Sequence, residues 1–162
     1  MKLLLENWNN YLNEEVNKTY YWQTNGPWKG EEIILGSTHV PKAIPRQKGK
    51  LEEIFEEVRL EKYPSRPSRL NCVYLCENIK GFSGKSFCSY PARYGGETYK
   101  VELRGDYNLF RANAEYFTEA AFATDEQSIR AWAERYWEGD HITFLEVLVS
   151  PPQAAIIVKK LK

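Results

Sequence analysis

Glu146 is the acidic residue of this sequence whose surroundings point most directly to chemistry. It lies in an apolar run, residues 142–150, that is rich in β-branched residues and typical of a strand. Side chains alternate between the two faces of a strand, so Glu146 shares one face with Ile142, Phe144 and Leu148. A carboxylate in an apolar row is usually paired, protonated or at the wall of a cleft, because burying a lone charge is costly. We predict the cleft; the alternative is an edge strand on which Glu146 faces water.

A second apolar segment follows closely. Residues 153–158 read as another short strand, and Pro151 and Pro152 force a turn before it. We therefore expect the two segments to form a terminal β-pair.

Basic residues in two segments are candidates for holding an anion. Arg66 and Arg69, with Ser68 between them, arrive at the start of an expected strand at 70–76. They can hold an anion or pair with the acidic helix that precedes them. A second basic loop, residues 41–50, is either ordinary solvated surface or a phosphate contact.

The cysteines and histidines do not form a recognisable metal site. Cys72, Cys76 and Cys88 make an odd number without a disulfide pattern, which suits a reducing compartment. Neither His39 nor His141 has a zinc-ligand spacing from a cysteine pair. We expect small buried thiols and no metal.

Composition limits the function classes further. The chain has 162 residues, enough for one domain with a sizeable core, and 22 basic residues balance 22 acidic ones. That balance provides no overall field for nucleic acid or membranes. No apolar run is long enough for a membrane span, and Gly84-Lys85-Ser86 lacks the spacing of a phosphate loop. These features predict a soluble, cytoplasmic protein.

Hydrophobic periodicity supplies the elements that must position these residues. Residues 1–30 predict an N-terminal amphipathic helix and an aromatic loop, and residues 31–162 predict a single α+β domain. In that domain, strands are expected at 31–38, 70–76 and 98–103, and helices at 51–58, 112–122 and 124–137. Thr124 and Gln127 form a plausible capping box for the last helix, and Gly139 ends it.

In this order, the chain resembles an ADP-ribosyltransferase-like domain, best of all the poly-ADP-ribose polymerase branch. Residues 145–154 are similar to the closing pattern of that family, a catalytic Glu on a strand followed by aliphatics, a turn and a Gln. Residues 34–37 lie where that branch has His-Gly-Thr or His-Gly-Ser, and residues 72–77 resemble a later strand with a Tyr. The Phe55–Tyr74 segment and the first residues are similar to small uncharacterised bacterial and phage proteins.

The resemblance implies an NAD-cleaving transferase with a split β-sheet core and flanking helices. NAD is then the substrate, the acceptor is unknown and expected to be a protein, and the location is the cytoplasm, or the host cytoplasm for a phage protein. Glu146 is the implied catalytic residue. The implied NAD-binding residues are Gly36, Ser37, Ser68, Arg69, Tyr74, Phe82 and Tyr90.

Three alternatives stay open. The sequence has Leu35 where that branch has its NAD-binding His, so the chain can be a non-catalytic binding or accessory module with the same fold. A glycoside or nucleoside hydrolase would use Glu146 together with Glu102 as a carboxylate pair. Nucleic-acid binding through the basic loop and the aromatic residues is the third.

Overall fold

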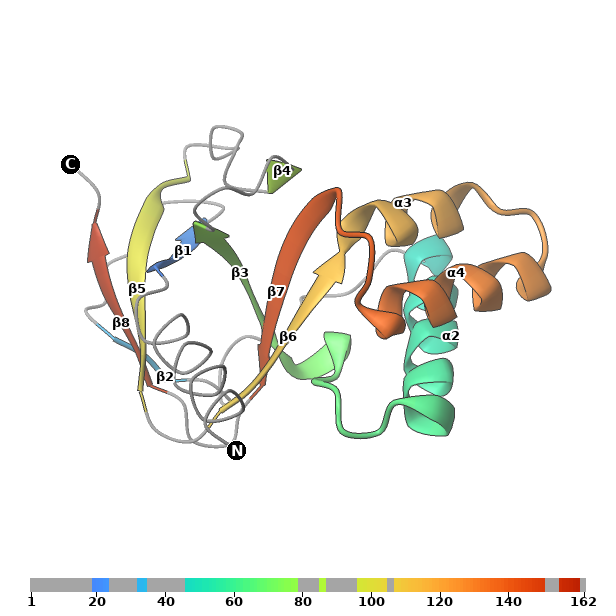
Figure 1. Ribbon diagram of the computed structural model, residues 1–162, viewed down its shortest axis with the longest axis horizontal. Coiled ribbons are helices and arrows are strands. Elements are labelled where there is room, and N and C mark those ends of the chain that lie inside the picture. Colours follow the sequence, from blue (N-terminus) through green and yellow to red (C-terminus); the bar gives the residue numbers. More distant parts are fainter. Residues whose placement is uncertain are drawn as a thin grey trace, which may run out of the picture.

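The computed structural model shows a mixed α/β chain in which the described helices gather on one side of a curled sheet (Figure 1). It describes residues 19–23, 32–34, 46–78, 85–86, 96–104, 107–150 and 155–160. The helix predicted before residue 19, most of the aromatic loop and the Pro151–Pro152 turn lie outside these ranges. Within the described part, no helix is long and apolar enough to cross a membrane.

The described strands join in one sheet. They are β1 (Thr19–Gln23), β2 (Glu32–Ile34), β3 (Val73–Asn78), β4 (Lys85–Ser86), β5 (Thr98–Arg104), β6 (Asn108–Asn113), β7 (Phe144–Ser150) and β8 (Ala155–Lys160). Their order is β2-β8-β5-β1-β3-β7-β4, and β6 pairs with β7 outside this path. The pairing of β4 with β7 is parallel, and the other described pairings are antiparallel.

The strand that carries Glu146 is interior, which decides one of the alternatives. β6 pairs with β7 along most of its length, while β3 pairs with residues 147–149 and β4 with residues 144–145. The edge-strand interpretation is therefore wrong. The expected terminal β-pair is also wrong, because β8 pairs with β5 and β2.

The helices match the predicted positions, with three corrections. α2 (Arg46–Lys62) begins earlier than predicted and takes in part of the basic loop, and β6 was missed altogether. α3 (Ala114–Phe122) follows β6 directly, and α4 (Glu126–Glu138) lies where expected. The capping residue of α4 is Asp125, which accepts a 2.8 Å hydrogen bond from the Ser128 amide, and not Thr124.

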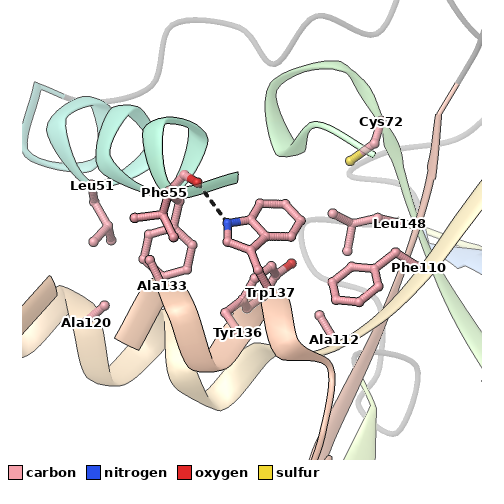
Figure 2. Close-up of a cluster of buried hydrophobic side chains, with 11 residues drawn as sticks. Leu51, Phe55, Cys72, Phe110, Ala112, Ala120, Ala133, Tyr136, Trp137 and Leu148 are labelled. Atoms are coloured by element: carbon pink, nitrogen blue, oxygen red, sulfur yellow. Dashed lines mark hydrogen bonds between the residues drawn. The ribbon is translucent and has the colours of Figure 1, made fainter. Parts of the chain in front are cut away.

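Two cores lie on opposite faces of β7, as the alternation of its side chains predicts. The sheet core fills the inner face of the sheet with Tyr20, Trp22, Val73, Leu75, Tyr99, Val101, Leu145, Val147 and Val149. The helix core lies between the outer face and the helices (Figure 2). It contains Leu51, Phe55, Val58, Cys72, Phe110, Ala112, Ala120, Ala133, Tyr136, Trp137 and Leu148.

The end of α4 is fixed against β6 and α2. The Trp137 indole donates a 2.8 Å hydrogen bond to the Phe55 carbonyl, drawn in Figure 2. Gly139 ends α4 in a left-handed conformation with φ of 77°. A Cβ at Gly139 would lie 2.8 Å from the ring of Phe110 and 3.2 Å from the carbonyl oxygen of Arg111, so glycine is required there.

The cysteine prediction holds only in part. Cys72 is a buried free thiol, as expected. Cys76 is also buried, but it is disulfide-bonded, so the prediction of three unpaired thiols is wrong. Cys88 lies outside the described residues.

Candidate functional site

Glu146 is buried on the helix side of β7. Its residue exposure is 2 %, so it neither faces bulk water nor sits at an open surface. Of the three environments expected for a carboxylate in an apolar row, the structure shows pairing: Nη1 of Arg69 lies 2.6 Å from Oε1 of Glu146. The hydroxyl of Tyr136, from α4, donates to the same oxygen. Within the described part of the chain, Oε2 of Glu146 has no hydrogen-bond partner.

Arg69 is the hub of this arrangement, which we name the helix-side cluster: Glu52, Arg69, Tyr136 and Glu146. Arg69 begins the short 3-10 helix η1 (Arg69–Asn71) between α2 and β3. Its Nε and Nη2 donate to the two carboxylate oxygens of Glu52, at 2.9 and 3.2 Å. Its Nη1 donates to Tyr136 and to Glu146, each at 2.6 Å. Four of the five N–H groups of the guanidinium are therefore engaged.

Aromatic rings enclose the guanidinium of Arg69. Its central carbon lies 3.9 Å from the ring centroid of Phe117, 5.0 Å from that of Tyr136 and 5.3 Å from that of Tyr74. Ring faces attract a cation at such distances, and more strongly where water is excluded. The Tyr74 hydroxyl also donates to the Arg69 carbonyl, at 3.1 Å. Tyr74 therefore contacts both the side chain and the backbone of Arg69.

Burial sets the protonation states around Arg69. It raises the pKa of Tyr136 and of Tyr74 well above that of a free tyrosine, against the opposing influence of Arg69. Burial likewise raises the pKa of the Cys72 thiol to about 12. Burial disfavours the charge of Arg69, but Tyr136, Tyr74 and the carboxylates outweigh it and keep the pKa of the guanidinium well above its usual value. At neutral pH, Arg69 is a cation among neutral hydroxyl and thiol groups.

The charge balance of the helix-side cluster does not suit an anion. One guanidinium faces two carboxylates, so with both ionised the cluster carries a net negative charge. A pyrophosphate at Arg69 would have to displace a carboxylate and would add negative charge to a buried site. A developing cation would be stabilised there instead.

The structure brings one predicted site residue, Glu146, next to another, Arg69, which is 77 residues away in sequence. Tyr74, a third predicted residue, follows Arg69 by five residues and contacts it. Ser68 lies next to them but does not contact Glu146. Its hydroxyl caps η1 through the Leu70 amide and donates to a carboxylate of α2 at 2.9 Å. The remaining predicted residues, Gly36, Ser37, Phe82 and Tyr90, lie outside the described residues.

Sequence reasoning missed two members of the cluster. Glu52 belongs to the acidic helix predicted at 51–58 but was not named as a candidate; its side chain is 13 % exposed and pairs with Arg69. The sequence did contain a signal for this pairing. Arg66 and Arg69 follow an acidic helix, and an ion pair with that helix was one of the two roles considered for them. Tyr136 lies in the helix predicted at 124–137, and nothing in the sequence indicated that its hydroxyl would reach Glu146.

A second polar group lies on the opposite face of the sheet, on β1, β3 and β6. We name its members, Tyr20, Glu77 and Arg111, the sheet-side cluster. Arg111 of β6 donates to Glu77 of β3 from Nε at 2.5 Å and from Nη2 at 3.1 Å. The side chain of Glu77 is fully buried, while that of Arg111 is 23 % exposed. The hydroxyl of Tyr20 lies 3.5 Å from Nη2 of Arg111. This carboxylate therefore also has an arginine and a tyrosine nearby.

The hydrolase alternative loses its carboxylate pair. Glu102 is on β5, and β1 and β3 separate β5 from β7 in the sheet. Three strand spacings amount to about 14 Å, beyond the roughly 5–9.5 Å that such pairs need. Among the described residues, no group of three or more His, Cys, Asp or Glu side chains is placed to hold a metal ion.

Residues 42–159 match the family described as "Protein of unknown function (DUF2441)". The match covers well over half of the chain, including every member of the helix-side cluster, and the chain belongs to this family. No curated protein matches the sequence.

Proposed function

We propose that this member of the DUF2441 family is an ADP-ribosyltransferase-like protein that cleaves the nicotinamide–ribose bond of NAD and transfers ADP-ribose to an acceptor. The observation that carries the proposal is the contact between Glu146 and Arg69, two residues that the resemblance implied and that are 77 residues apart in sequence. The proposed acceptor is a protein, and the proposed location is the cytoplasm, of the host if the protein is of phage origin.

The chemistry asks for a fixed negative charge. When the bond between ribose and nicotinamide breaks, its electron pair leaves with nicotinamide and positive charge builds on the sugar. Glu146 would stabilise that charge through a hydrogen bond to a ribose hydroxyl, which is stronger in the transition state than in the ground state. Arg69 and Tyr136 both hold Oε1, so Oε2 is the oxygen left for the sugar.

Access to Glu146 requires movement. With 2 % of the residue exposed, the packing around η1 must open before a nucleotide can reach the carboxylate. Lids that open and close over a catalytic group are common in enzymes. We assign Arg69 to holding Glu146, in place of the pyrophosphate contact that the resemblance implied, because its N–H groups are already engaged.

Nicotinamide release from NAD tests the proposal, compared among the native protein, Glu146→Gln and Glu77→Gln. Glu77 is the matched control, because it is an equally buried carboxylate paired with an arginine on the other face of the sheet. We expect Glu146→Gln to lower the rate on the order of 100- to 1000-fold. We expect Glu77→Gln to retain activity if it remains folded, as judged by circular dichroism. Equal rates in folded Glu146→Gln and native protein would rule out Glu146 as the catalytic residue.

A non-catalytic module with the same fold is the second candidate, and the burial of Glu146 favours it. In that case the helix-side cluster serves only to join α2, η1, α4 and β7. A folded native protein that releases no nicotinamide, with or without cell extract, would support this candidate over the transferase.

A further inference from the structure

Glu52 holds Arg69 in a particular orientation. Its two oxygens accept from Nε and Nη2, which is a side-on contact along one edge of the guanidinium. That contact leaves Nη1 to point away from α2 toward β7 and α4. Glu146 consequently receives a single N–H from Arg69, at Oε1.

We propose that Glu52 is a positioning residue for Glu146: it keeps Arg69 side-on to α2, so that one carboxylate oxygen of Glu146 is anchored and the other stays available to a ligand. The inference rests on the proposed function for its catalytic consequence, although not for its structural one. Guanidinium and carboxylate groups prefer a two-point contact, so Arg69 released from Glu52 would bind both oxygens of Glu146. Glu52 therefore competes with Glu146 for the same cation.

α2 itself provides a matched control one helical turn away. Glu56 makes the same kind of side-on contact with Arg59, with Nε to Oε2 at 2.9 Å and Nη2 to Oε1 at 2.6 Å. The side chains of Glu52 and Glu56 are similarly buried, at 13 % and 19 % exposure. Only Glu52 contacts the arginine that binds Glu146. Glu56→Gln thus reproduces the loss of a largely buried ion pair and leaves the contact of Glu52 with Arg69 in place. Glu56 also accepts the hydrogen bond of Ser68, so this control includes the loss of a contact beside Arg69 as well.

The test compares crystal structures of Glu52→Gln and Glu56→Gln, together with their rates of nicotinamide release. In Glu52→Gln we expect Arg69 to turn and contact both oxygens of Glu146, and kcat to fall on the order of 10- to 100-fold with KM nearly unchanged. In Glu56→Gln we expect the contact between Arg69 and Glu146 to stay as it is and kcat to change little. Restoring the carboxylate as Glu52→Asp should recover part of kcat.

The experiment distinguishes failure of the positioning role from failure of the proposed function. If Glu52→Gln leaves Arg69 with its single contact to Glu146, or if Glu56→Gln lowers kcat as much, the positioning role is overturned. If the native protein releases no nicotinamide, the proposed function fails, and the crystal structures alone decide whether Glu52 positions Arg69.

Discussion

The helix-side and sheet-side clusters place the same three side-chain types on opposite faces of one sheet, yet they differ in composition and closure. On the helix side, Arg69 is 7 % exposed and faces two carboxylates; on the sheet side, Arg111 is 23 % exposed and pairs with Glu77. Buried ion pairs add little stability compared with well-packed apolar residues, and breaking one is costly. On the helix side one guanidinium serves two carboxylates and is closed off from water, so the loss of that arginine should be the more costly of the two.

The largest difference in stability between the two clusters should appear when the arginine of each is replaced. Arg69→Met leaves two carboxylates, Glu52 and Glu146, without their cation, whereas Arg111→Met removes the guanidinium that Glu77 contacts. We expect Arg69→Met to cost about 3–5 kcal/mol of unfolding free energy and Arg111→Met to cost less. Urea denaturation of both variants measures the difference. A larger loss of unfolding free energy in Arg111→Met would show that the Arg111–Glu77 pair contributes more to stability than the helix-side cluster.

Removing one hydroxyl on each side gives a smaller contrast. The Tyr136 hydroxyl bridges Arg69 and Glu146, so Tyr136→Phe should cost about 1–3 kcal/mol. The contact of the Tyr20 hydroxyl with Arg111 is long, at 3.5 Å, so the loss of this contact in Tyr20→Phe should cost less than about 1 kcal/mol. Thermal unfolding of the two variants checks this ranking, and equal losses would contradict it.

The alkylation rate of Cys72 measures how accessible the helix side of the sheet is to solvent. Because burial raises the pKa of its thiol to about 12, the native protein at pH 8 should react with iodoacetamide at Cys72 far more slowly than the unfolded chain. A thiol with a raised folded pKa stabilises the fold below its unfolded value near 9, and this stability is lost as pH rises from 9 toward 12. Peptide mapping after alkylation measures the labelling at Cys72. Labelling as fast as in urea would show an open helix side.

The smallest effect concerns the neighbouring ion pair on α2. The hydrogen bond from Arg59 lowers the pKa of Glu56 below 4.5, and Ser68 adds to this against the effect of burial. A lowered folded pKa stabilises the protein above the unfolded pKa, and the contribution disappears as pH falls through the folded value. The Tm advantage of the native protein over Glu56→Gln should therefore shrink between pH 5 and acid conditions. A constant gap in calorimetry across that range would contradict this account.

Much of the fold was readable from local patterns. The hydrophobic spacing of residues 51–58 predicted α2, and the alternation around Glu146 correctly placed Leu148 on the helix side of β7. Ile142, predicted on the same face as Glu146, packs instead against the sheet core, because it lies before β7 begins at Phe144. β6 was missed because its polar and charged residues lack a clean alternation, and the alanine-rich stretch after it favoured one longer helix. The pairing of β8 with β5 is long-range information that a Pro-Pro turn does not contain.

Half of the helix-side cluster, Arg69 and Glu146, was predictable from the sequence, and its geometry was not. A carboxylate in an apolar row had to find a partner, and the sequence offered Arg69 as a cation at the start of a strand. It did not show that the two would pair, because the distance between them in sequence is 77 residues. The position of the Tyr136 hydroxyl depends on the rotation of α4 about its axis, which only tertiary packing fixes.

Gly139 ends α4 at a point where the helix packs closely against β6. The turn after α4 presses against the ring of Phe110 and the carbonyl of Arg111, both on the strand that carries the sheet-side arginine. A methyl group at this position would overlap with Phe110 and crowd the carbonyl of Arg111, so either the end of α4 or β6 would have to shift. Glycine at this position therefore allows the end of α4, the helix that carries Tyr136, to pack directly on β6, the strand that carries Arg111.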